Sequence, residues 1–240
     1  MLTSRAGRIA AAVSLVGYPM LIFAYWLLYP AYGKSGATAI LHAIDGHVTR
    51  TEVADVFAFA GAFLAVPASL VLMTLFVQHR SRIGWLGGLL SAVGWIAIVG
   101  ALMLDIVAVE IARNSGPTPA NIHLYHDLLT SPLTITLDVI ATLHVLGGMM
   151  IGVGLIRTRL VGLTAGVVAT VAPVLHLVSN VAGILWLDEA TWIALAVVYA
   201  GVARTILTSK TATAPQRIAN TARVGAEAVE LVVDDHRLSS

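Results

Sequence analysis

The sequence predicts an all-α membrane protein, a polytopic bundle of six transmembrane helices with both termini in the cytoplasm. Two observations on composition lead to this fold class. Hydrophobic residues make up 58% of the 240 residues and charged residues only 11%, whereas a soluble domain carries about 25% charged residues. The mean hydropathy is +0.87. A third observation is that the apolar residues gather into six segments, each close to the roughly 20 residues that a helix needs to cross the hydrocarbon.

The first three spans are predicted from apolar runs and from the residues that precede them. They cover approximately Ile9–Tyr29, Val53–Val77 and Ile83–Ala112. The first run is longer than the apolar region of a signal peptide, so we expect it to remain as a membrane anchor. The segment Thr49–Glu52 has the Thr-x-x-Glu spacing of a capping box and predicts the start of the second span.

The last three spans cover approximately Leu133–Ile156, Leu160–Trp186 and Thr191–Leu207. Ser131 and Pro132 predict the start of the fourth, because serine caps a helix and proline suits its first turn. We expect Asp188 to cap the sixth span, which is the shortest of the six. The few residues between the fifth and sixth spans predict a tight helical hairpin.

The orientation follows from the placement of lysine and arginine, which are enriched in cytoplasmic loops. With six spans, nine basic residues fall on one side: Arg5, Arg8, Arg80, Arg82, Arg157, Arg159, Arg204, Lys210 and Arg217. The other side has Lys34, Arg50 and Arg113. This asymmetry predicts a multi-pass protein of the cell (inner or plasma) membrane, with a transmembrane domain over residues 1–208. Residues 209–240 are predicted to form a cytoplasmic tail, partly amphipathic or disordered.

Composition also excludes several classes of function. Cysteine is absent, which excludes disulfides, thiolate metal sites and cysteine nucleophiles. The formal net charge of +1 predicts no nucleic-acid partner. No glycine-rich phosphate loop is present, so an ATP-driven pump is not expected. Glycine pairs four residues apart predict close helix packing within the monomer: Gly84 and Gly88, Gly148 and Gly152, and Gly162 and Gly166.

Polar residues inside the predicted spans are the candidate functional residues, because ionisable groups are costly in hydrocarbon. They lie in the outer half of the third, fourth and fifth spans: Asp105, Glu110, Asp138, His144, His176 and Asn180. Asp105, Asp138 and Glu110 are the candidate catalytic acids. His144 and His176, at similar depth, are candidate ligands of a divalent metal or of haem. Asn180 and Trp95 are the candidate substrate-binding residues, and cross-helix packing is the alternative role for the polar set.

The outer loops carry a second polar group. It consists of His42, Asp45, His47, His123, His126 and Asp127. Zinc binding and simple solvation are both compatible with this pattern. The long outer segment between the third and fourth spans is predicted to form a lid over a cavity lined by Asp105 and Asp138.

Three segments carry a family resemblance: Ser4–Ala10, the outer segment before the second span, and Gly152–Arg157 leading into Leu160–Gly162. In these segments the chain resembles an uncharacterised family of small bacterial six-helix integral membrane proteins, over about residues 4–207. The resemblance implies the fold and a bacterial membrane, and it carries no activity.

These observations favour a protein that binds or converts a hydrophobic small molecule, in a cavity in the outer half of the bundle, by acid–base or metal chemistry. Two alternatives remain open. One is a proton-coupled permease or exporter of small molecules, although no internal repeat is evident. The other is a non-catalytic immunity or regulatory membrane protein. The expected partners are the lipid bilayer and a hydrophobic ligand, and the sequence does not determine the oligomeric state or whether the protein is an enzyme.

Overall fold

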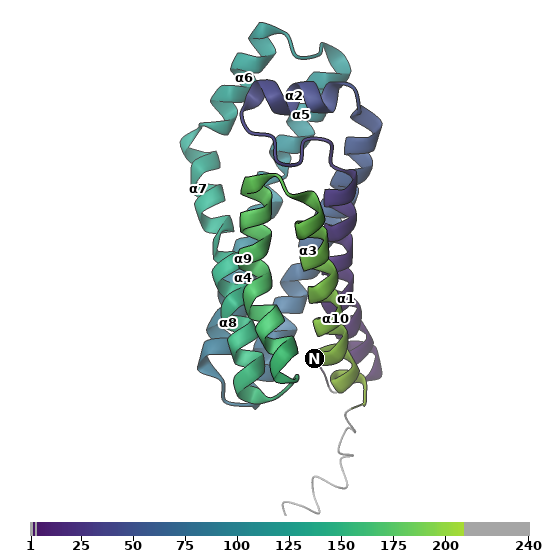
Figure 1. Cartoon of the computed structure of the whole chain (residues 1–240), viewed down its shortest axis with the longest axis vertical. Helices are drawn as coiled ribbons and strands as arrows, with labels where there is room; N and C mark the ends of the chain where they lie inside the picture. The colour runs from purple at the N-terminus through teal and green to yellow at the C-terminus, as the bar shows by residue number, and fades with distance from the viewer. Residues whose placement is uncertain (1, 3, 209–240) are drawn as a thin grey trace, which may run out of the picture. The chain divides into compact units, whose positions relative to one another are not determined.

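The structure, a computed structural model, describes residue 2 and residues 4–208 of the chain. Its described residues form ten helices and no strand (Figure 1). Six helical segments are long and apolar enough to cross a membrane. The predicted fold class, an all-α bundle of six spans, is therefore confirmed. The predicted tail over residues 209–240 lies outside the described residues.

Four of the six spans are single helices, and two are interrupted. The single helices are α1 (Arg5–Leu28), α3 (Val48–Gln78), α9 (Leu163–Ala182) and α10 (Leu185–Thr208). The third span consists of α4 (Arg82–Ala101) and α5 (Met103–Asn114), and the fourth of α7 (Pro132–Ala141) and α8 (Leu143–Thr158). Two shorter helices, α2 (Ala37–Asp45) and α6 (Pro119–Leu129), lie between spans.

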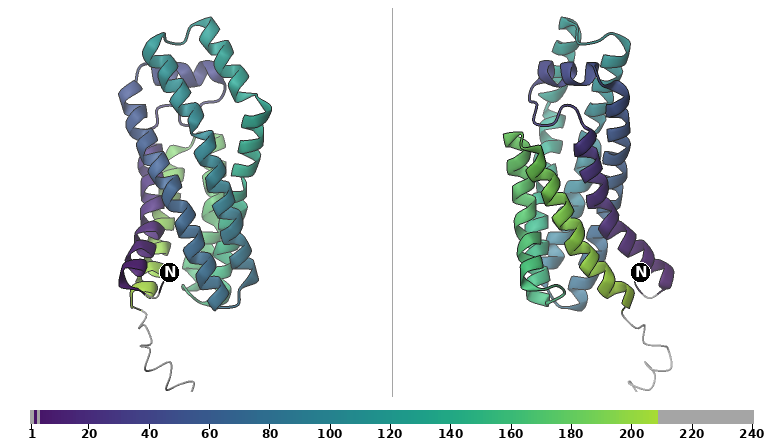
Figure 2. Two further views of the ribbon diagram at one scale, coloured as in Figure 1. Left: turned by 180° about the vertical axis from the view of Figure 1, so that it is seen from behind. Right: turned by 45° about the vertical axis from the view of Figure 1, so that its right-hand side comes forward.

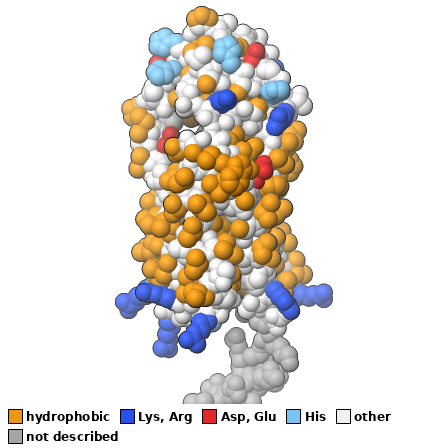
Figure 3. Space-filling view, in the orientation of Figure 1, with side chains coloured by type: hydrophobic (Ala, Val, Ile, Leu, Met, Phe, Trp, Pro, Cys, Tyr) orange, Lys and Arg blue, Asp and Glu red, His pale blue; other side chains and the backbone are white. Residues whose placement is uncertain are grey.

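The two ends of the bundle differ in charge. The arginine end carries the start of α1 and the loops α3–α4 and α8–α9, with Arg5, Arg8, Arg80, Arg82, Arg157 and Arg159. The histidine end carries α2, α6 and the residues His42, His47, His123 and His126. Figure 3 shows basic side chains at the lower end, histidines at the upper end, and a mainly hydrophobic surface between them. This distribution is what the positive-inside pattern describes, and the orientation itself stays a prediction.

Several predicted helix ends are wrong. The capping box does not form, because α3 begins at Val48, one turn earlier, and the Thr51 hydroxyl donates to the carbonyl of His47. Asp188 does not cap the sixth span, because α10 already begins at Leu185. The early start of α10 has its cause in Gly183. The left-handed backbone of this residue (φ +68°) ends α9 earlier than the hydrophobicity indicates.

This early turn also moves Trp186 from the fifth span into the sixth. The shortest span is therefore α9, with 20 residues, whereas α10 has 24. The predicted start of the fourth span is confirmed, because the Ser131 hydroxyl accepts from the Thr134 amide and Pro132 is in the first turn.

Glycine contacts bring the helices close together within the chain. For five of the paired glycines, an added Cβ atom would lie within 2.6 Å of a neighbouring side-chain or backbone atom: Gly84, Gly88, Gly148, Gly152 and Gly166. Gly94 is the tightest case for the candidate site, since its Cβ would lie 2.3 Å from the backbone nitrogen of His144. Gly162 caps α9 and has no such neighbour. The predicted packing role is thus confirmed for five of the six paired glycines.

The longest helices extend beyond the hydrocarbon and carry a cap. The 31 residues of α3 span about 46 Å, whereas the hydrocarbon is about 30 Å thick. In Figure 2 the α9–α10 hairpin ends below α2, which lies across the histidine end, and below α6, which runs obliquely down toward α7. A small core lies where α2, α5 and α6 meet, and it contains the buried side chains of Leu41, Ile44, Val109 and Tyr125. We call α2 and α6 the cap.

Candidate functional site

Five buried or half-buried residues from four elements form a group beneath the cap, which we call the acid cluster: Tyr25, Tyr29, Asp55, Asp105 and Tyr125. Asp105 lies in the first turn of α5, directly after the interruption at Leu102. The Tyr29 hydroxyl donates to its Oδ1 at 2.8 Å, and the Tyr25 hydroxyl donates to its Oδ2 at 3.1 Å. The start of a helix also favours a negative charge. These contacts stabilise the Asp105 carboxylate.

Asp55 on α3 is the second carboxyl group of the cluster, and the sequence analysis did not select it. It is 7% exposed, its Oδ1 has no hydrogen-bond partner, and it interacts electrostatically with Asp105. The signal was present in the sequence. Asp55 shares the helical face of Thr51, Ala58 and Ala62, which are all buried. We missed it because it stands near the predicted start of the second span, where an acid is usually solvated.

The tyrosines outside the spans remain neutral donors. Burial, and then the charge of Asp105, raises the pKa of Tyr29 well above its ordinary value. Burial also raises the pKa of Tyr125, with further contributions from Asp105 and Asp55. Both phenols therefore keep their protons throughout the neutral range.

His144 and His176 form a second group deeper in the bundle, which we call the histidine pair. The Nδ1 atom of His144 lies 2.6 Å from the carbonyl oxygen of Ala141, just before the interruption at Thr142. The Nδ1 atom of His176 lies 2.6 Å from Oδ1 of Asp188, which also accepts from Ser179. A carbonyl or carboxylate oxygen accepts, so each Nδ1 donates. In the neutral form of each ring, Nε2 therefore carries the lone pair.

Aromatic rings surround the histidine pair. The two histidine rings lie 5.9 Å apart between centroids. Trp95 lies 5.1 Å from His144, and Trp192 lies 4.9 Å from His176. Both histidines, both tryptophans and Tyr18 line one small cavity of about 20 Å³. This volume suits a water molecule or a single ion, and it is far too small for haem.

The predicted site residues fall into separate places. The structure brings together Trp95, His144 and His176. The ring of Trp26 lies 6.1 Å from the ring of His176. Trp26 also follows Tyr25 of the acid cluster in the chain. Asp138 is exposed on α7, and Asn180 is half-buried on α9 one turn from His176. The structure does not bring Asp138 to Asp105.

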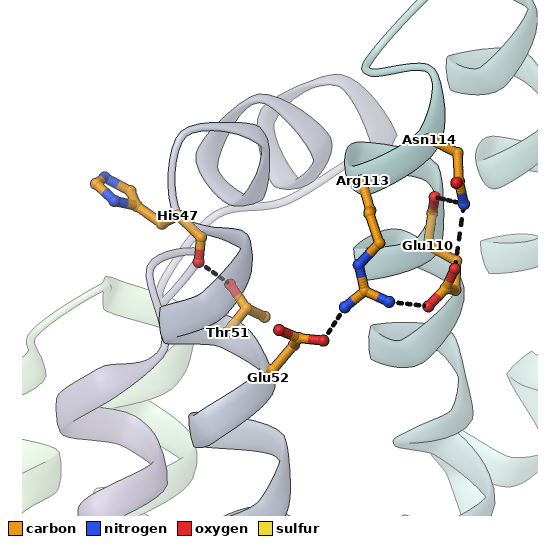
Figure 4. A network of polar contacts seen from close by, with 6 residues as sticks. All are labelled: His47, Thr51, Glu52, Glu110, Arg113 and Asn114. Atoms are coloured by element: carbon orange, nitrogen blue, oxygen red, sulfur yellow. Dashed lines mark hydrogen bonds and ion pairs between the residues drawn. The ribbon is translucent and has the colours of Figure 1, made fainter.

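Glu110 belongs to a polar network at the surface (Figure 4). It pairs with Arg113 at 2.7 Å and accepts from Asn114, and Arg113 also pairs with Glu52 on α3. These exposed contacts join α3 to α5. Exposed ion pairs contribute little to stability. These pairs link the two helices that carry Asp55 and Asp105.

The loop histidines lie at the surface of the cap. His42, His123 and His126 line an open groove of about 700 Å³ between α2 and α6. His123 pairs with Asp127 at 3.3 Å, one turn apart on α6. Within the part of the chain that the structure describes, no group of three or more His, Asp or Glu side chains is arranged to hold a metal ion.

Comparison with known proteins adds no family to this geometry, since no family model, no curated protein and no solved structure matches the chain. The arrangement of the residues is therefore the sole basis for the functional argument.

Proposed function

We propose that this multi-pass membrane protein binds a hydrophobic small molecule beneath its cap and exchanges a proton with it through Asp105 and Asp55. The observation that carries the proposal is the acid cluster, in which the buried Asp55 interacts with the half-buried Asp105 and one oxygen of Asp55 has no partner. Two such groups do not both carry a charge without a large cost, so the pair is suited to taking up and releasing a proton.

The surroundings support a hydrophobic ligand. The cap above the acid cluster meets the bundle through Leu41, Ile44, Val109 and Tyr125, which are all buried. Both carboxyl groups of the cluster stand on membrane-spanning helices, so a lipid-soluble molecule reaches them after partitioning into the bilayer. In this proposal the cap is the lid, as the long outer segment predicts, and Tyr29 and Tyr25 orient the reacting carboxylate.

The test is to identify what the purified protein retains. Wild type, Asp105→Asn, Asp55→Asn and the matched surface control Asp127→Asn are purified in one detergent, extracted with chloroform and methanol, and compared by mass spectrometry. We expect a small molecule that is enriched in wild type and Asp127→Asn. It should fall at least about tenfold in the other two variants, a loss of about 1.4 kcal/mol in binding. Identical extracts from all four proteins would contradict the proposal.

A second function, proton-coupled export, is favoured by the two interrupted spans. The third span breaks at Leu102, next to Asp105, and the fourth at Thr142, next to His144. Discontinuous spans beside ionisable residues are typical of substrate sites in transporters. Ethidium uptake into proteoliposomes under an inside-acid pH gradient tests this function. Transport should be lost in Asp105→Asn and retained in Asp127→Asn, and uptake equal to that of protein-free liposomes would contradict it.

A further inference from the structure

We infer that the histidine pair binds one monovalent copper ion, with the Nε2 atoms of His144 and His176 as its two protein ligands. This inference goes beyond the proposed function, because it concerns a different group of residues and a different kind of ligand. It rests on the state of the two nitrogens, the spacing of the two rings and the chemistry of their surroundings.

Both histidines are prepared as ligands in the same way. Each Nδ1 donates to an oxygen, of Ala141 in one case and of Asp188 in the other. Metal-binding histidines generally use their second nitrogen in this manner, which fixes the tautomer and the ring orientation. No hydrogen bond within the described residues uses either Nε2, and both rings line the same cavity. Two lone pairs are therefore available at one small space.

The spacing of the rings fits a single shared ion. With metal–nitrogen bonds of about 2 Å and about 1.1 Å from nitrogen to ring centre, the centres of two imidazoles on one ion lie at most about 6.2 Å apart. A tetrahedral angle at the ion would reduce this separation to about 5.1 Å. The observed 5.9 Å indicates an angle well above tetrahedral. The cavity of about 20 Å³ has room for one ion.

The surroundings favour a monovalent ion over a divalent one. Zinc takes about four ligands, usually with a carboxylate or thiolate among them, and the described side chains supply no third His, Asp or Glu to this pair. Monovalent copper accepts two nitrogen ligands in a nearly linear arrangement, and imidazole suits copper. Trp95 and Trp192 lie beside the two histidine rings and line the same cavity, and aromatic rings close to a cation stabilise its charge. The buried Asp188, which accepts from His176, balances that charge.

Silver(I) is the probe, because it has the charge and ligand preference of monovalent copper and is inert to oxygen. The full chain in detergent, in chloride-free buffer, is titrated with silver nitrate while tryptophan fluorescence is recorded. We expect quenching that saturates at one equivalent, since Trp95 and Trp192 are next to the site. His144→Ala and His176→Ala should weaken binding at least about a hundredfold, and Asp188→Asn by about 10- to 100-fold. His79→Ala, an exposed residue at the arginine end, should change nothing.

A second variant separates loss of a ligand from loss of folding. His144→Met supplies a thioether, which binds copper(I) and silver(I) but is a poor zinc ligand, so it should restore silver binding relative to His144→Ala. The inference would be overturned if wild type failed to bind one equivalent of silver(I), or if both alanine variants bound silver(I) as tightly as wild type. Zinc binding to wild type that is stronger than silver binding would overturn the monovalent assignment. None of these outcomes depends on the ligand of the acid cluster, so the two proposals fail independently.

Discussion

Asp105 and Asp138 show how strongly tertiary contacts decide the role of one residue type. Both are aspartates in the halves of adjacent spans that lie nearer the histidine end, and the sequence treats them alike. In the fold, Asp105 accepts from two tyrosine hydroxyls, whereas Asp138 is exposed on α7. The difference arises because the end of α1 brings Tyr25 and Tyr29 to Asp105, whereas no hydrogen bond among the described residues involves the side chain of Asp138.

The Tyr29 hydroxyl provides a test at the residue scale. A hydrogen bond to a charged group contributes about 1.5–3 kcal/mol to stability, so Tyr29→Phe should lower the unfolding free energy by that amount. The pKa of Tyr29 is raised in the folded protein. Its contribution is therefore complete below the ordinary tyrosine value of about 10 and is lost as the pH rises through the raised value.

The measurement is thermal unfolding of wild type and Tyr29→Phe in one detergent at pH 8 and pH 9. The difference between the two proteins should be the same at both values. A difference that disappears between pH 8 and pH 9 would mean that Tyr29 ionises in this range and does not hold Asp105 as described.

At the element scale, the interruptions and the glycines act together on the histidine pair. The break at Thr142 leaves the Ala141 carbonyl to accept from His144, and Gly94 lets α4 approach α8 at the same level. The sequence predicted the close approach from glycine spacing, but only at other positions. It did not predict the breaks at Leu102 and Thr142, because neither has a proline or a glycine as its signal.

Gly94→Ala tests this contact between two elements. Its Cβ would lie 2.3 Å from the backbone nitrogen of His144, and a backbone atom cannot yield as a flexible side chain does. Overpacking of this kind costs about 1–3 kcal/mol, so we expect a lower thermal stability and weaker silver binding. Gly201→Ala is the matched control. Gly201 lies inside α10, and a Cβ atom added there would meet no neighbouring atom within 4 Å. Equal effects of the two substitutions would contradict the described α4–α8 packing.

For the whole molecule, the absence of cysteine makes the predicted orientation directly testable. Ser35→Cys is exposed at the histidine end and His79→Cys at the arginine end. In intact cells, a membrane-impermeant maleimide should label Ser35→Cys at once and His79→Cys only after permeabilisation. The reverse pattern would place the termini outside and overturn the positive-inside assignment.

Much of the fold could be predicted because its signals are local. Six apolar runs predicted six spans, and Ser131 and Pro132 predicted the start of α7. The ends of the spans were less accurate, since the apolar run continues through the turn at Gly183. Half of the candidate site was predictable: Asp105, His144, His176 and Trp95 were selected, while Asp55 and the tyrosine partners were not.

By itself, the sequence determined that the chain is a six-span membrane protein with basic residues at one end and histidines at the other. These properties depend on the kinds of residue in each stretch, because hydrocarbon accepts apolar helices and leaves charges at its surfaces. The tertiary structure alone decided that Asp55 joins Asp105, that Asp188 holds His176, and that Asp138 and Glu110 face outward. The reason is that the face of a helix that turns inward, and its partner there, depend on packing between segments far apart in the chain.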